Sequence, residues 1–234
     1  MNDTAIKTAI AEVLQNKGFE VTLLEESDEP TPDLLATDQK DVFLIEIKER
    51  HGNSSQSSTP FEVQLDKICY QNRLSGICRK AVDQLRTNQN QEIFRLLWLI
   101  ADPNEQHLHY EQFRATMYGI RLVVCKDSDV KEGYYIKNSE FYRWRDNLDG
   151  VTLGNFGGLF LNNYSPRYSQ FRNTPFRYLF GSAVCDPPVI EKSGNAFYLD
   201  SDVDRGDELA VKKALESKYG IEVAHFENLV RFSV

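Results

Sequence analysis

Residues 32–48 read PDLLATDQKDVFLIEIK, two short apolar segments joined by a polar turn. The second segment, Val42–Lys48, has the composition of a β-strand, in which side chains alternate between the two faces of the sheet. Glu46 and Lys48 therefore project from the same side, where a buried sheet does not normally tolerate charge. A hairpin pairing of the two segments would bring Asp33 beside Glu46. The sequence thus predicts two carboxylates and one ammonium group in one place.

Two carboxylates beside a lysine suit the chemistry of phosphate esters. Carboxylate oxygens bind Mg²⁺, and a bound divalent cation neutralises phosphate charge and lowers the pKa of water. A nearby ammonium adds positive charge where the transition state gains negative charge. Taken alone, however, a Glu-x-Lys pattern more often marks a solvated ion pair on an exposed strand. The interpretation therefore depends on the surrounding elements.

Composition is that of a folded protein with a proper core. The chain has 234 residues, of which 41% are hydrophobic and 26% charged, as in ordinary globular domains. A formal net charge of −8 argues against indiscriminate adhesion to nucleic acid but permits a local basic surface.

No membrane or secretory signal is expected. The longest apolar run, Leu96–Ala101, is far too short to cross a bilayer, and the N-terminal residues lack a basic flank and an apolar stretch. The four cysteines are widely spaced and form no Cys-x-x-Cys pair, so neither a disulfide framework nor a zinc site is indicated. We expect a cytoplasmic protein.

Periodicity and turn signals predict helices and strands in an order typical of a mixed sheet covered by helices. Helices are expected at about 4–17, 61–71, 76–89, 105–118 and 207–219, and strands at 19–24, 33–37, 42–48, 95–101, 120–125, 134–137 and 221–225.

This element order, with Pro32-Asp33 on the second strand and Glu46-x-Lys48 on the third, resembles the PD-(D/E)XK nuclease superfamily. That superfamily includes restriction endonucleases and archaeal Holliday-junction resolvases. Residues 11–21, AEVLQNKGFEV, also resemble the first helix and strand of the resolvases. The resemblance covers residues 3–101. It implies an α/β fold with a restriction-endonuclease-like mixed β-sheet flanked by helices.

The resemblance also implies a division of the chain and a set of functional residues. Residues 1–138 would form the nuclease core, and residues 139–234 an α+β C-terminal extension for substrate binding or dimerisation. Asp33 and Glu46 would hold Mg²⁺, or Mn²⁺ in its place, helped by the backbone carbonyl of Ile47. Lys48 would orient the attacking water. Gln84 matches a glutamine often seen on the following helix of these families; alternatively, it is a helix-surface residue.

The first helix departs from the family pattern. Resolvase-like families often place a metal-binding glutamate early in this helix, but this chain has Lys7, Thr8 and Ala9 there. Glu12 lies on the wheel opposite the apolar positions and reads as solvated. This departure puts a second metal-binding centre in doubt. Glu25 or Glu26 could substitute; alternatively, that acidic turn is simply solvated.

A basic and aromatic island lies in the C-terminal half. Residues 151–184 contain no Asp or Glu, yet Arg167, Arg172 and Arg177 occur there among the aromatic residues Tyr164, Tyr168, Phe171, Phe176 and Tyr178. In such regions, arginines bind phosphates and aromatic side chains stack on bases. Alternatively, the aromatic side chains form the core of this half, with the arginines at its edge.

The sequence therefore predicts a magnesium-dependent nuclease that acts on DNA, with RNA not excluded, by attack of a metal-activated water. An endonuclease is favoured over an exonuclease, and a homodimer is expected because double-strand cleavage commonly uses two sites. Two alternatives stay open. One is a nucleic-acid-binding domain of the same fold that does not cut; the other is an acidic interaction or regulatory protein.

Overall fold

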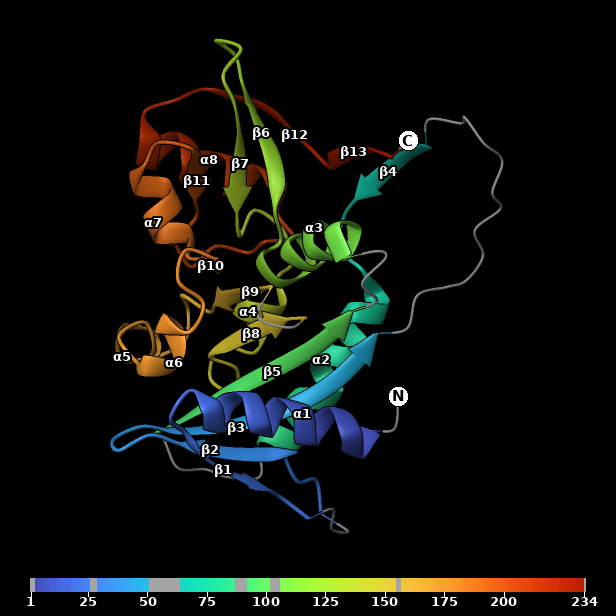
Figure 1. Cartoon of the computed structure of the whole chain (residues 1–234). Coiled ribbons are helices and arrows are strands. Elements are labelled where there is room, and N and C mark those ends of the chain that lie inside the picture. The colour runs from blue at the N-terminus through green and yellow to red at the C-terminus, as the bar shows by residue number, and fades with distance from the viewer. Residues whose placement is uncertain are drawn as a thin grey trace. The chain divides into compact units, whose positions relative to one another are not determined.

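The computed structural model of the chain describes residues 3–25, 29–50, 64–86, 92–101, 106–154 and 157–233 (Figure 1). It is a mixed α/β fold that divides into two compact units, each assembled from three separate segments. Unit 1 comprises residues 1–51, 76–104 and 144–185, and unit 2 comprises residues 52–75, 105–143 and 186–234.

Unit 1 is built on a mixed seven-stranded sheet, which confirms the predicted sheet class. Its strand order is β1-β2-β3-β5-β8-β9-β10. The pairs β1–β2, β2–β3 and β8–β9 are antiparallel, and the other neighbours are parallel. The strands are β1 (Glu20–Leu23), β2 (Leu34–Thr37), β3 (Val42–Arg50), β5 (Ile93–Ala101), β8 (Gly150–Leu153), β9 (Gly158–Leu161) and β10 (Val184–Cys185). Strands β8, β9 and β10, which the sequence analysis assigns to the C-terminal extension, thus continue the sheet that carries β2 and β3.

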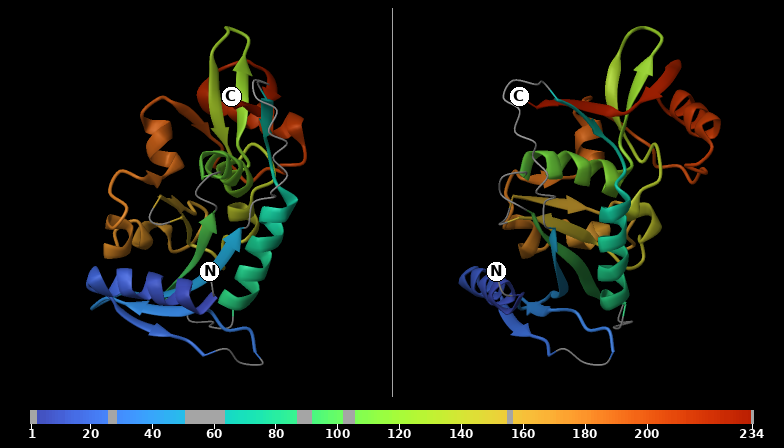
Figure 2. Two further views of the ribbon diagram at one scale, coloured as in Figure 1. Left: turned by 45° about the vertical axis from the view of Figure 1, so that its right-hand side comes forward. Right: turned by 90° about the vertical axis from the view of Figure 1, so that its right-hand side faces the viewer.

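Helices flank this sheet on both sides. Helix α1 (Asp3–Asn16) and helix α2 (Asn72–Leu85) lie on opposite sides of β3 and β5 (Figure 2). The apolar stripe of α1 is buried in a core cluster with the odd-numbered face of β3 and with the short helices α5 (Tyr168–Phe171) and α6 (Pro175–Tyr178). The fully buried Phe43 stacks on Phe176 there, with ring centroids 5.1 Å apart. The face of β3 that carries Glu46 is therefore the one opposite this core.

Unit 2 contains two smaller sheets. A four-stranded sheet has the order β11-β7-β6-β12, and β4 pairs with β13 in an antiparallel ribbon. The strands are β4 (Gln64–Ile68), β6 (Arg121–Cys125), β7 (Val130–Tyr134), β11 (Ala196–Tyr198), β12 (Val223–Glu227) and β13 (Leu229–Ser233). The helices are α3 (Gln106–Tyr118), α4 (Glu140–Arg143), α7 (Pro187–Lys192) and α8 (Glu208–Tyr219).

Two expected elements of unit 2 are wrong. A helix is predicted at 61–71, but Gln64–Ile68 is a strand, because it pairs with a segment at the far end of the sequence. A strand is predicted at 134–137, but β7 ends at Tyr134. The next residue, Tyr135, has a φ of 63°, which is incompatible with extended backbone.

Candidate active site

The β2–β3 hairpin places Asp33 opposite Glu46. Leu34 pairs with Ile45 in the antiparallel register, so the preceding residue, Asp33, lies across from Glu46. The turn that sets this register is closed by the Asp38 carboxylate, whose Oδ1 accepts hydrogen bonds from the backbone N–H groups of the two residues that precede β3. Local turn chemistry therefore brings the two predicted carboxylates together.

Glu46 is the most unusual side chain of this site. It is fully buried, and its Oε1 forms an ion pair with Nζ of Lys48 on the same face of β3. Its Oε2 is also buried and, while the carboxyl is ionised, accepts no hydrogen bond from the described residues; a protonated Glu46 can share a hydrogen bond with Asp33. A buried carboxylate oxygen without a partner is costly to a folded protein. A ligand that supplies the missing partner would remove that cost.

Burial also changes the protonation of Glu46. Removal from water raises the pKa of its carboxyl to about 8; the Lys48 ammonium opposes this rise and the neighbouring Asp33 adds to it. Metal ligation requires the deprotonated carboxylate, so binding of a cation at this site would release a proton near neutral pH.

Asp33 is held from two sides. Its Oδ2 accepts a hydrogen bond of 2.7 Å from the backbone N–H of Ile47, and its Oδ1 lies 2.8 Å from Nζ of Lys7 on α1. Its side chain is only 9% exposed. The Lys7 contact is absent from the sequence prediction, which treats Lys7 only as the residue that replaces a glutamate. The position of Lys7 beside Ile6, on the buried stripe of α1, is the signal that could have indicated it.

The side chains of Asp33 and Glu46 have the ligand chemistry that a divalent cation such as Mg²⁺ prefers. Two carboxylates lie side by side, one of them with a buried oxygen that lacks a partner. In the part of the chain that the structure describes, no group of three or more His, Cys, Asp or Glu side chains could hold a metal ion. A cation here would therefore take its further ligands from backbone or water. The proposed carbonyl ligand, Ile47, is buried on β3 between the two charged residues.

The other candidate from the nuclease resemblance, Gln84, lies near the C-terminal end of α2. It is half-buried, and it lies on the helix that covers the sheet on the side opposite α1 (Figure 2). Its expected part in the site stays a prediction.

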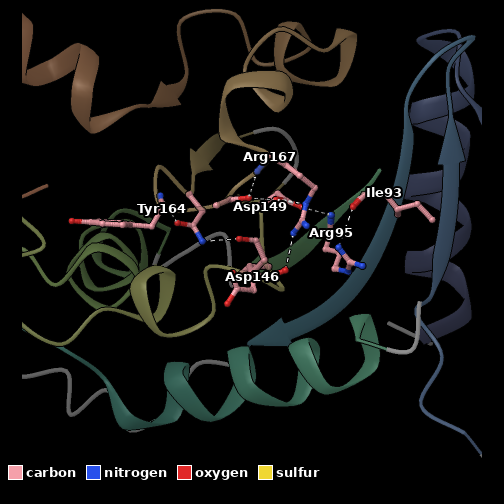
Figure 3. A network of polar contacts seen from close by, with 9 residues as sticks. Ile93, Arg95, Asp146, Asp149, Tyr164 and Arg167 are labelled. Carbon is pink, nitrogen blue, oxygen red and sulfur yellow. Dashed lines mark hydrogen bonds and ion pairs between the residues drawn. The ribbon is translucent and has the colours of Figure 1, made fainter. Parts of the chain in front are cut away.

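Arg167, predicted to contact nucleic acid, is engaged inside unit 1 (Figure 3). Its Nε donates to both carboxylate oxygens of the fully buried Asp149, at 2.9 and 3.0 Å, and its guanidinium also donates to the backbone carbonyl of Asp146. Asp149 further accepts hydrogen bonds from the backbone N–H of Arg95, at 2.7 Å, and from the Ser165 hydroxyl. This network ties the start of β8 to β5, so we assign Arg167 to the fold and not to the substrate.

The rest of the arginine island is divided between core and surface. Phe171 and Phe176 are fully buried, as the core alternative predicts. Arg172 and Arg177 are half-buried, and their guanidinium groups lie over the rings of tyrosines, each 5.4 Å from the ring centroid. One of these rings, Tyr178, is 62% exposed. An arginine on an exposed ring is the part of the island that suits nucleic-acid contact.

The pKa of Glu46 predicts a pH-dependent stability. The folded protein binds this proton more tightly than the unfolded chain, whose carboxyl titrates near 4.5. The free energy of unfolding of the metal-free protein is therefore expected to fall as the pH rises from about 4.5 to about 8. Urea unfolding at both ends of this window, in the presence of a chelator, measures the change. Glu46→Gln should have a flatter profile; identical profiles for the two proteins would show that Glu46 does not titrate in this range.

The fold and the site define a mixed α/β protein with a carboxylate–lysine cluster, formed by Asp33 directly before β2 and by Glu46 and Lys48 on β3 of its larger sheet. No protein-family model matches this chain, and no curated protein is significantly similar to it. Within the described residues, no helix combines the length and apolar character that crossing a membrane requires.

Proposed function

We propose that unit 1 is a restriction-endonuclease-like domain that hydrolyses phosphodiester bonds with the help of Mg²⁺ or Mn²⁺. The observation that carries this proposal is the buried Oε2 of Glu46, which has no hydrogen-bond donor when the carboxyl is ionised, next to Asp33 and Lys48. A fully buried carboxylate of this kind is costly as a structural element, but it is expected where a cation is bound.

Each residue of the site has a distinct part in this reaction. Asp33 and Glu46 would hold the cation, which when bound would lower the pKa of a water and neutralise phosphate charge. Lys48 is 27% exposed, so its ammonium can reach both Glu46 and a substrate outside the site. It would orient the attacking water and stabilise the negative charge that develops on the phosphate. The backbone N–H of Ile47 fixes the orientation of Asp33.

DNA is the proposed substrate, and a cytoplasmic homodimer the proposed form, since paired sites permit cleavage of both strands. Arg172 and Arg177 support this choice of substrate, because they supply positive charge beside tyrosine rings in a region without acidic residues. Restriction, phage defence, repair or recombination would each use such an activity.

One prediction separates Arg172 and Arg177, which are proposed to contact DNA, from Arg167, which is assigned to the fold. Replacing both Arg172 and Arg177 with glutamine should flatten the log–log salt dependence of duplex DNA binding by about 0.9 for each lost phosphate contact. Binding measured at three salt concentrations tests this. Cleavage at saturating DNA should persist, because neither residue contacts the carboxylate cluster in this proposal.

Arg167→Gln provides the contrast. It should destabilise the protein by about 3–5 kcal/mol, because it leaves the buried Asp149 without its ion pair. The salt slope of the protein that remains folded should not change. A double variant with an unaltered salt slope, or an Arg167→Gln variant of normal stability that has a reduced slope, would contradict this division.

A further inference from the structure

Lys7 is a cation of this site that the predicted mechanism does not use. Its Nζ lies 2.8 Å from Oδ1 of Asp33, and only 16% of its side chain is exposed. The neighbouring residues Ile6 and Ile10 are buried in the core, so α1 holds Lys7 in this place. The ion pair is therefore largely shielded from water and ordered by the packing of the helix, unlike an exposed surface pair.

The ion pair also engages the second oxygen of Asp33. Oδ1 contacts Lys7 and Oδ2 accepts the Ile47 hydrogen bond, so each oxygen already has one partner. When all four groups are ionised, the positive charges of Lys7 and Lys48 cancel the negative charges of Asp33 and Glu46. One divalent cation would then leave an excess of two positive charges, which a phosphodiester partly neutralises. A second cation would double the excess, and no third carboxylate of the described chain joins the cluster.

We propose that Lys7 is a positioning residue that restricts this site to one divalent cation, because its ammonium lies against Oδ1 of Asp33 and so repels a second cation from that oxygen. This inference rests on the proposed metal site. It concerns the number of ions, which can be measured without any cleavage.

The test is the stoichiometry of Mn²⁺ binding to the full chain, measured by calorimetry and by the electron paramagnetic resonance signal of the unbound ion. The unaltered protein should bind one Mn²⁺ per chain. Lys7→Glu should bind two, because a glutamate is one bond shorter than a lysine and leaves space for a cation between two carboxylates. Lys17→Glu, a matched control at the exposed position directly after the same helix, should still bind one.

Lys7→Gln keeps the inference testable should Lys7→Glu fold poorly. It removes the positive charge beside Asp33 and should bind one Mn²⁺ about tenfold more tightly, since a like charge at roughly 5 Å disfavours a divalent ion even at the dielectric constant of water. Unchanged affinity in Lys7→Gln, an unchanged stoichiometry in a folded Lys7→Glu, or two ions in the unaltered protein would overturn the role of Lys7 and leave the proposed metal site standing. An unaltered protein that binds no Mn²⁺ would overturn the metal site itself, and the role of Lys7 with it.

Discussion

Lys48→Ala is expected to lower the rate of DNA cleavage by on the order of 10²–10³-fold, the usual cost of removing one preorganised electrostatic contact to a transition state. Nucleic-acid affinity should change little, because the lysine acts on charge that develops only during the reaction. Single-turnover cleavage with saturating DNA measures the rate, and an equilibrium binding assay with a chelator present measures the affinity.

Lys40→Ala is the matched control for this variant. Lys40 is an exposed lysine in the turn of the same β2–β3 hairpin, and its loss should leave cleavage unchanged. A thermal melt of both variants shows whether the fold survives. If a folded Lys48→Ala protein cut DNA at the normal rate, the assignment of Lys48 would be wrong even if the metal site were right.

Glu46→Gln should change metal affinity and stability in opposite directions. Loss of the carboxylate should weaken binding of Mg²⁺ and Mn²⁺ by more than the 10–100-fold that is typical of an outer-shell partner, because Glu46 is a proposed direct ligand. In the absence of metal, the same variant should be more stable at about pH 8, by on the order of 1–3 kcal/mol, because it no longer places an ionised carboxylate in a buried position. Calorimetry with Mn²⁺ tests the expected loss of metal affinity, and urea unfolding in the presence of a chelator tests the expected gain in stability.

Glu49→Gln is the control for Glu46→Gln. Glu49 lies on the same strand but at an odd-numbered position, so its side chain projects from the opposite face of the sheet. The control should leave metal affinity unchanged. Should Glu46→Gln bind Mn²⁺ as well as the unaltered protein, Glu46 would not be a metal ligand.

The part of the site that the sequence predicts is the part that local structure determines. Strand alternation places Glu46 and Lys48 on one face, and a short turn closed by Asp38 fixes Asp33 across from Glu46. Both follow from residues within the stretch 32–48. The mixed sheet is likewise predicted, because apolar runs of strand length alternate with helical periodicity along the first half of the chain.

The features that the sequence does not reveal depend on contacts between distant segments. Lys7 reaches Asp33 only because the packing of α1 sets its place beside β2. Arg167 has a buried partner because β8 begins next to Asp149, which a charge pattern alone does not show. The helix expected at 61–71 is a strand because its partner, β13, lies near the C-terminal end of the chain. In each case tertiary packing decides what local propensity leaves open.

The most direct measurement for the central claim is cleavage by the purified chain of supercoiled plasmid, linear duplex, single-stranded DNA and RNA, each with Mg²⁺ and each with excess EDTA. The proposed site predicts cleavage of DNA in Mg²⁺, partial or full replacement of Mg²⁺ by Mn²⁺, and none in EDTA. Cleavage that continues undiminished in EDTA, or intact substrates in every condition with a folded protein, would contradict the assignment of Asp33, Glu46 and Lys48 as a metal-dependent nuclease site.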